Sequence, residues 1–245
     1  MTTTDPDELR QRVLRSPSMI GADLASVVST PEAYVVPPPA GTPVRYRVAA
    51  VDLGIKTATP LAMARLGCEV HVLPATSTAG QILGADPDGV FFSNGPGDPA
   101  ACGYAVTAMR DVLAARVPVF GICLGSQVLG RALGLDTYKL RFGHRGVNQP
   151  VQDQRTAKVH ITSHNHGFAV AMPAAGAGHA FETDFGPAQV THVNLNDGVV
   201  EGLALADRPA FAVQYHPEAA PGPHDARGLF GEFCALMAQR QGRGA

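Results

Sequence analysis

One apolar segment that runs into a glycine-flanked cysteine constrains the fold more than any other part of the sequence. The segment 117–122, VPVFGI, reads as a buried strand, and it leads through Cys123 and Gly125 into a helix-forming stretch. This strand, turn and helix pattern is typical of a nucleophile elbow, here with sulfur in place of oxygen. Gly121 and Gly125 leave room for a sharp turn, and the first N–H groups of the helix are free to bind an oxyanion. The pattern predicts an α/β sheet that holds Cys123 above its edge.

The chain around the elbow alternates between β-rich and helical runs. The β-rich runs of the first half are 44–53, 69–73, 89–92 and 117–122, and helical runs at 60–66 and 104–115 lie between them. The second half has β-like runs at 159–162, 189–195, 199–206 and 210–215 and a closing helix at 226–240. Apolar runs in this alternation are typical of parallel strands covered by helices. We therefore predict an open, mostly parallel sheet flanked by helices, with ligands at the carboxyl ends of its strands.

A proline-rich stretch suggests how the chain is divided. Residues 37–43, PPPAGTP, form a stiff linker that lacks several N–H donors. The division predicted here is an N-terminal connector over 1–43 and one catalytic unit over 44–245.

Composition and charge exclude several classes of function. The formal net charge is −2, from 19 basic and 21 acidic side chains, and the chain has no Trp. This balance gives no bulk attraction to nucleic acid or to an anionic membrane. No apolar run approaches the roughly 18 residues of a membrane span, and no secretory signal is recognised. Four cysteines without CxxC spacing fit a reducing compartment. We expect a cytoplasmic protein with neither a nucleic-acid nor a membrane partner.

A thiol nucleophile needs a base, and the sequence offers one at the end of another apolar run. Residues 211–215 lead into His216, and Glu218 follows two positions later, after a proline that prevents an immediate helix. A carboxylate on one ring nitrogen would hold the imidazole tautomer and favour the imidazolium form. Alone, such a histidine is more often a turn residue, but paired with Cys123 it is a candidate base. The remaining cysteines, Cys68, Cys102 and Cys234, are expected to be structural.

Two further polar segments are candidates for binding roles. The loop 93–99, SNGPGDP, is rich in glycine, so its N–H groups can approach an anion closely, although a tight βα connection is the plainer interpretation. His164 and His166 could suggest a metal pair, but no third ligand is near them in the sequence, so packing roles are favoured and no metal site is expected. A polar loop that faces a partner subunit is expected at His144, Arg145 and Asn148.

These motifs together resemble the class I, or triad, glutamine amidotransferases, and more specifically the small subunit of carbamoyl-phosphate synthase. The resemblance extends from about Asp23 to the C-terminal helix, and it rests on the segments 93–99, 142–150, 165–170 and 216–225 in this order, together with Cys123. It implies the flavodoxin-like α/β fold of that family, with the nucleophile elbow as its centre.

The resemblance also implies a reaction. Cys123 would attack the side-chain amide of L-glutamine, and His216, supported by Glu218, would transfer protons until glutamate and ammonia are released. The backbone N–H groups of Gly95 and Leu124 would form the oxyanion hole. Positions that hold glutamine in the family are matched by Gly97, Gln127, Asn165, Gly167 and Phe168.

The implied partner is the large subunit of carbamoyl-phosphate synthase. That subunit uses ATP and bicarbonate with the ammonia to make carbamoyl phosphate for arginine and pyrimidine biosynthesis. No cofactor is expected in this chain, because the glycine spacings of nucleotide-binding loops are absent from the 93–99 loop.

Two features depart from the family pattern, and other functions stay open. The family's small subunit carries an N-terminal domain, which this sequence is expected to lack. Ser126 stands where many relatives have His or Asn, and it is expected on the helix surface. The alternatives are a stand-alone glutaminase, an amidotransferase that serves another synthase, and a non-catalytic docking module of the same fold.

Overall fold

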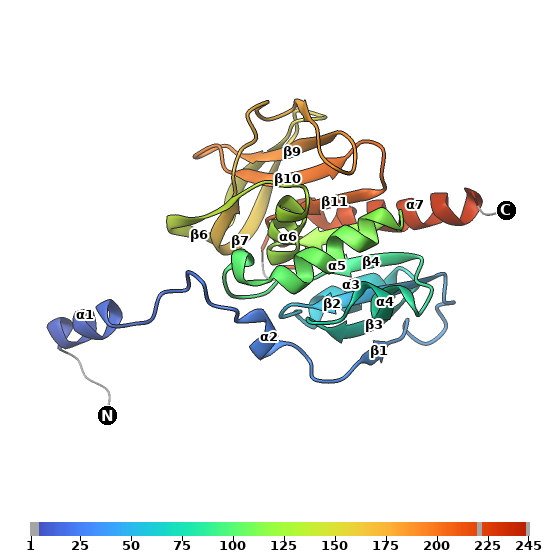
Figure 1. The fold of residues 1–245 in the computed structure, drawn as a ribbon, viewed down its shortest axis with the longest axis horizontal. Coiled ribbons are helices and arrows are strands. Elements are labelled where there is room, and N and C mark those ends of the chain that lie inside the picture. The colour runs from blue at the N-terminus through green and yellow to red at the C-terminus, as the bar shows by residue number, and fades with distance from the viewer. Residues whose placement is uncertain (1–4, 220–221, 244–245) are drawn as a thin grey trace.

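The centre of the molecule is a parallel sheet. The structure, a computed structural model, describes residues 5–219 and 222–243, and within them eleven strands form one sheet in the order β1-β3-β2-β4-β5-β11-β10-β9-β6-β7, with β8 beside β9 (Figure 1). The parallel strands are β3 (Cys68–Pro74), β2 (Tyr46–Asp52), β4 (Gly89–Phe92), β5 (Val119–Ile122) and β11 (Ala210–Val213). All four residues of β4 are buried, as expected of a strand covered on both faces. The predicted α/β fold is confirmed.

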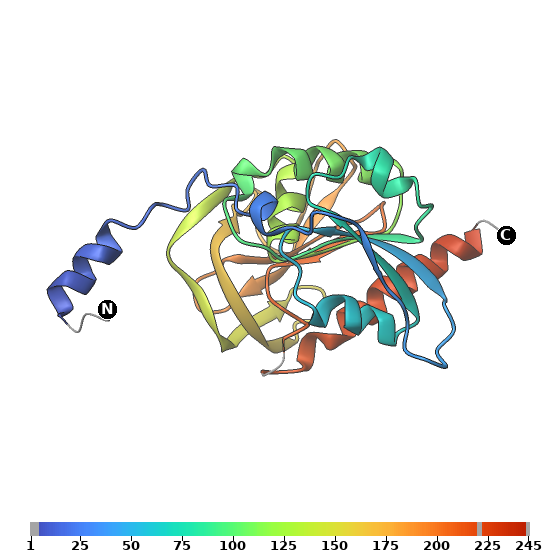
Figure 2. The same cartoon turned by 90° about the horizontal axis from the view of Figure 1, so that it is seen from below.

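Helices cover both faces of the parallel strands (Figure 2). One layer consists of α4 (Ala79–Leu83), α5 (Gly103–Ala114) and α6 (Leu124–Ala132), and the other of α3 (Ala58–Arg65) and α7 (Gly228–Arg243).

The amphipathic pattern of the longer helices explains this arrangement. On α5, Ala105, Met109 and Val112 recur at helical spacing, and they are buried in the same core as Phe92 of β4. On α7, buried aromatic residues pack against the opposite face of the sheet; Phe233 lies 5.8 Å from Phe120 of β5 between ring centroids. Two hydrophobic cores, one on each face, therefore fix the strands that carry the elbow.

Antiparallel strands extend the sheet beyond β11. They are β10 (Val200–Leu205), β9 (Ala188–Asn194), β6 (Thr137–Asp153) and β7 (Val159–Val170), with the short β8 (Ala180–Phe181) at the side. β6 and β7 form a long ribbon at one end of the molecule (Figure 1). The ribbon returns toward the parallel strands, because the backbone N–H of His216 donates to the carbonyl of Ser163 in β7 at 2.9 Å.

The predicted polar loop at His144, Arg145 and Asn148 is wrong, because these residues belong to β6. Most side chains of β6 are exposed or half-buried, so the strand lacks the apolar run that identifies the others. The pairing with β7 is direct in this region: His144 lies opposite His166, and Arg145 lies opposite Asn165.

The first 43 residues include parts that pack on the sheet. β1 (Tyr34–Val36) pairs antiparallel with β3, and Ala25, the first residue of α2 (Ala25–Val28), is fully buried. In contrast, α1 (Pro6–Leu14) has no buried residue and lies away from the body of the molecule in both views (Figures 1 and 2). The predicted boundary at residue 43 stays a prediction.

The length and the hydrophobicity of the helices decide whether any of them could cross a membrane. Within residues 5–219 and 222–243, no helix combines the length and the hydrophobicity that a membrane span requires.

Candidate active site

Cys123 occupies a strained turn between β5 and α6. Its backbone angles are φ 55° and ψ −103°, a conformation that residues other than glycine rarely adopt. The N–H of Cys123 donates to the carbonyl of Val213 at 2.9 Å, which ties the turn to β11. The side chain is 4% exposed. The predicted elbow is therefore present, with its cysteine at the N-terminus of a helix.

The turn packs directly on the loop 93–99. The N–H of Gly125 donates to the carbonyl of Ser93 at 3.0 Å, and a Cβ atom at Gly125 would collide with the carbonyl of Phe92. Gly95 is similarly close to the carbonyl of Leu53. Glycine is required at both positions because backbone meets backbone there.

His216 and Glu218 lie just beyond the end of β11 and form the expected pair. Nδ1 of His216 is 2.7 Å from Oε1 of Glu218, and both residues are buried, at 5% and 7% exposure. Because a carboxylate accepts only, Nδ1 carries a proton, and in the neutral form of the ring Nε2 presents its lone pair. Nε2 has no hydrogen-bond partner among the described residues. We refer to Cys123, His216 and Glu218 as the triad.

The charges of the triad support one another. Burial lowers the pKa of His216, but the charge of the nearby Cys123, together with the hydrogen bond to Glu218 and the charge of Glu218, outweighs it and raises this pKa to about 9. Burial raises the pKa of Glu218. The hydrogen bond from His216 and the positive charges of His216 and Lys56 outweigh this effect and lower the pKa of Glu218 below its usual value. An imidazolium at His216 is thus stabilised by the carboxylate of Glu218, and it would also stabilise a thiolate formed at Cys123.

Lys56 is a residue of this site that the sequence did not reveal. Its Nζ lies 3.1 Å from Nδ1 of His216 and 3.3 Å from Oε1 of Glu218, and its side chain is 47% exposed. Lys56 follows β2, a parallel strand of the same sheet, so its position after a strand end was the available signal.

The predicted oxyanion donors lie on either side of the elbow. Leu124 is the first residue of α6, and Gly95 belongs to the loop that packs against this helix. Neither backbone N–H donates to a group of the described residues. Both donors are free to bind an oxyanion, and this role stays a prediction.

The predicted glutamine-binding residues fall into two groups. Gln127, 3% exposed, donates from Nε2 to the carbonyl of Phe168 and to Oε1 of Gln214, each at 2.9 Å, so its amide is engaged within the protein. Asn165 and Gly167 lie on β7 and are exposed and half-buried, respectively.

Gly97 lies near the N-terminal segment. Its φ is 105°, and a Cβ there would lie 2.8 Å from the carbonyl of Ala22. The next residue, Asp98, accepts from the N–H of Gly21 at 2.8 Å. Residues of the N-terminal segment therefore form part of the surroundings of the loop 93–99.

The burial of Ser126 differs from the prediction, whereas the burial of the remaining cysteines fits a structural role. Ser126 is 1% exposed, so its predicted surface position is wrong; α6 lies between the sheet and α5 and is buried on most sides. Cys68 and Cys102 are buried away from solvent, and Cys234 is half-buried with its Sγ 3.8 Å from that of Cys68.

Four side chains from β6, β7 and β10 that can bind a metal ion lie close together. His144, His164, His166 and Glu201 each offer a ligand atom, and these four atoms lie within 4.8 Å of one another. We call this group the histidine cluster. The expectation that His164 and His166 have no third ligand nearby is wrong, because β6 and β10 bring two more.

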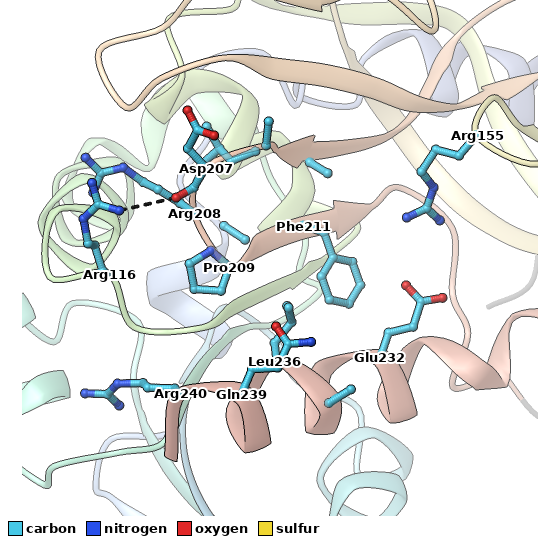
Figure 3. A pocket seen from close by; sticks show the side chains of 15 residues that line it. Arg116, Arg155, Asp207, Arg208, Pro209, Phe211, Glu232, Leu236, Gln239 and Arg240 are labelled. Carbon is cyan, nitrogen blue, oxygen red and sulfur yellow. Dashed lines mark hydrogen bonds between the residues drawn. The ribbon is translucent and has the colours of Figure 1, made fainter. Parts of the chain in front are cut away.

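A large groove lies away from the triad. Its volume is about 740 Å³, and it runs between the turn that joins β10 to β11 and helix α7 (Figure 3). Arg116, Arg208 and Arg240 donate to backbone carbonyls there, and Arg155 pairs with Asp153. No triad residue is among the described residues that line it. The groove is therefore separate from the elbow.

Comparisons with known proteins agree with this geometry. The model of a family described as glutamine amidotransferase class-I matches residues 49–236. A carbamoyl phosphate synthase small chain from Streptomyces avermitilis is 59% identical over 234 residues, which are 95% of this chain and 60% of that protein. One from Mycobacterium tuberculosis is 57% identical over 236 residues, with 96% and 62% covered. The chain therefore spans about three fifths of the length of the curated relatives it matches.

A solved structure shares the fold at low identity. A Thermoplasma acidophilum protein described as a GMP synthase subunit superposes with a TM-score of 0.66 and 18% identity, over 81% of this chain and 96% of that one. At this identity the likeness concerns the fold alone.

Proposed function

The chain belongs to the class-I glutamine amidotransferase family, and on this premise we propose that it hydrolyses L-glutamine to glutamate and ammonia. The observation that carries the proposal is the 2.7 Å bond between His216 and Glu218 beside the strained elbow of Cys123. This bond leaves Nε2 of His216 without a protein partner, and a free imidazole nitrogen near a thiol is what nucleophilic catalysis requires.

In the first half of the proposed reaction a thioester forms. The proton of Cys123 moves to Nε2 of His216, and Sγ attacks the side-chain carbonyl carbon of glutamine. The carbonyl electron pair moves to oxygen, where the N–H groups of Gly95 and Leu124 stabilise the negative charge. The imidazolium then protonates the amide nitrogen, the C–N bond breaks, and ammonia leaves a γ-glutamyl thioester on Cys123.

In the second half water releases the product. Nε2 of His216 takes a proton from water as the water oxygen attacks the thioester carbonyl, and the C–S bond breaks. Glutamate leaves, and the Cys123 thiolate is restored beside the imidazolium. Glu218 stays ionised throughout and holds the ring in the tautomer that both halves need.

The proposed destination of the ammonia is the large subunit of a carbamoyl-phosphate synthase. The identity to small chains of that enzyme supports this partner. The large subunit would supply the ATP and bicarbonate chemistry for carbamoyl phosphate, and this chain would need no cofactor. A cytoplasmic location belongs to the same proposal, and four free cysteines fit a reducing compartment.

The proposal is tested by the glutaminase activity of the purified chain. Cys123→Ser is expected to lower kcat by on the order of 10⁴-fold or more, because the nucleophile is lost while the turn is kept. Cys234→Ser, a matched change on α7, is expected to leave the rate unchanged. A glutamine analogue that alkylates thiols is expected to label Cys123; labelling of Cys102 or Cys234 instead, with activity retained in Cys123→Ser, would overturn the proposal.

The partner is tested separately. The expected results are glutamine-dependent formation of carbamoyl phosphate and co-purification with a synthetase large subunit. Glutaminase activity without coupling would instead indicate a stand-alone glutaminase or an amidotransferase of another synthase. Binding to the large subunit without glutamine hydrolysis would indicate a docking module.

A further inference from the structure

We infer that the histidine cluster is a binding site for a divalent transition-metal ion, with Zn²⁺ as the best match, held by His144, His164, His166 and Glu201. The site is distinct from the triad, and metal binding by it does not depend on the proposed glutaminase activity.

The spacing of the ligand atoms fits a small tetrahedral ion. We call the ring nitrogens that face Glu201 the inner nitrogens; they are Nδ1 of His144, Nδ1 of His164 and Nε2 of His166. Oε1 of Glu201 lies 3.4, 3.6 and 3.9 Å from them, in this order. The inner nitrogens of His164 and His166 are 3.1 Å apart. Four ligands that each lie about 2.0–2.1 Å from zinc are separated by about 3.3 Å. No pair exceeds 4.8 Å, so ion binding would require the most distant ligand atoms to approach by at most about 1.5 Å.

The outer nitrogen of each ring is already held by an oxygen atom. Nε2 of His144 lies 2.8 Å from Oδ2 of Asp197, and Nδ1 of His166 lies 2.8 Å from the carbonyl of Phe168. Nε2 of His164 lies 2.7 Å from Oγ1 of Thr162, whose own proton is donated to the carbonyl of Gln149. Each of these oxygens accepts, so each outer nitrogen carries the proton.

These outer bonds fix the direction of three lone pairs. With the outer nitrogens protonated, the inner nitrogens of His144, His164 and His166 are acceptors, and all three face one carboxylate oxygen of Glu201. Lone pairs that face one another and a carboxylate oxygen repel unless a proton or a metal cation lies between them. Outward hydrogen bonds to carboxylate, carbonyl or hydroxyl oxygens are also the usual environment of metal-bound histidines.

Burial strengthens the case for a cation. The side chains of His164 and Glu201 are fully buried, and Nδ1 of His144 and Oε2 of Glu201 have no hydrogen-bond partner among the described residues. Buried polar atoms are rarely left unpaired, because the desolvation is costly.

The number of ligands indicates a structural role. Four protein ligands close the coordination sphere, whereas catalytic zinc sites keep a position open. The ligands come from β6, β7 and β10, so an ion would join the β6–β7 ribbon to the rest of the sheet. β7 also carries Asn165 and Gly167, between and beside the cluster histidines, and the ion would thereby fix the strand on which they lie.

The test uses the whole chain without a polyhistidine tag. The wild-type protein is expected to take up one equivalent of Zn²⁺ by equilibrium dialysis and elemental analysis. Co²⁺ in its place is expected to give the visible absorption bands of tetrahedral nitrogen and oxygen ligation, without a sulfur charge-transfer band. Zn²⁺ is also expected to raise the midpoint of thermal unfolding.

Variants separate the cluster from other possible sites. Glu201→Gln, of equal size, and His144→Gln, at the rim of the cluster, are each expected to weaken Zn²⁺ binding by more than about 100-fold. His192→Gln, a buried histidine of β9 outside the cluster, is the matched control and is expected to bind normally. Cys123→Ser is expected to bind one full equivalent of Zn²⁺, as the wild-type protein does.

Three results would overturn the inference. One is wild-type protein that takes up neither Zn²⁺ nor Co²⁺ in stoichiometric amount. Another is one equivalent of Zn²⁺ that still binds to Glu201→Gln and His144→Gln but not to Cys123→Ser, which would place the ion at the triad. The third is an equal rise in unfolding temperature with Zn²⁺ in wild type and Glu201→Gln.

Discussion

The triad and the histidine cluster both contain buried histidines whose outer nitrogen is held by an oxygen atom. In the triad that oxygen belongs to Glu218, and in the cluster such oxygens belong to Asp197, Thr162 and Phe168. The two sites differ in what the inner nitrogen faces. In the triad it serves one thiol, whereas in the cluster three such nitrogens converge on one carboxylate. By our proposals, the same arrangement would support proton transfer at one place and cation binding at the other.

The two sites are also neighbours. The backbone N–H of His216 is bonded to Ser163, and the ring of Tyr215 lies 6.1 Å from that of His164 between centroids. Variants at one site can therefore be compared with variants at the other within the same local structure.

Among the changes that compare the two sites, replacing the oxygen that orients His216 is expected to have the largest effect. Glu218→Gln is expected to lower the glutaminase kcat by about 10²- to 10⁴-fold, because an amide neither fixes the tautomer nor stabilises the imidazolium. Glu201→Gln makes the same change at the cluster, and it is expected to abolish zinc binding and to keep kcat within about tenfold of wild type. Steady-state kinetics and metal content measured on both variants check this. Equal losses of kcat in the two variants would contradict the distinction between the sites.

The sequence identified the triad because each part of it is local. Cys123 follows one apolar strand and is flanked by glycines, and His216 follows another, so short motifs at strand ends placed both. The parallel order of β5 and β11 then brings them together, since the carboxyl ends of parallel strands share one edge. The same rule could have pointed to Lys56 after β2.

The histidine cluster has no such local signal. His144 and Glu201 are 57 positions apart in the numbering and lie on β6 and β10, and they meet only because the antiparallel strands return toward β11. β6 is also polar along most of its length, so no apolar pattern marked it as a strand. Long-range pairing of a polar ribbon is a tertiary property, which single-sequence patterns do not encode.

The next effect concerns an outer oxygen of the cluster. Asp197→Asn removes the carboxylate that accepts from Nε2 of His144 and is expected to weaken Zn²⁺ binding by about 10- to 100-fold. The glutaminase rate is expected to stay close to that of wild type at saturating Zn²⁺. Competition with a chromophoric chelator measures the affinity, and Asp184→Asn, an exposed aspartate that pairs with Arg110, is the control. Unchanged affinity in Asp197→Asn would mean that this carboxylate does not orient the ring.

A smaller and graded effect is expected from pH. The pKa of His216 is raised to about 9, so the ring keeps its proton as pH rises to that value. Above it the imidazolium that protonates the leaving ammonia is lost, and kcat/KM is expected to fall about tenfold per pH unit. The fall reports on the Cys123–His216 pair rather than on either group alone. A rate that declines already from pH 7 would contradict the raised pKa.

The smallest effect is expected at Lys56, which contacts the triad from its solvent side. Its Nζ is 3.3 Å from Glu218, but its side chain is about half exposed, and ion pairs of this kind contribute about 0.2–1 kcal/mol. Lys56→Met is therefore expected to lower kcat/KM only about two- to fivefold. Loss of the cation also removes one of the influences that lower the pKa of Glu218, so activity should begin to fail at a higher pH on the acid side. The alkaline fall near pH 9 should not move, because it is set by Cys123 and Glu218 around His216. A shift of the alkaline fall alone would show that Lys56 acts on His216 directly, through its 3.1 Å approach to Nδ1.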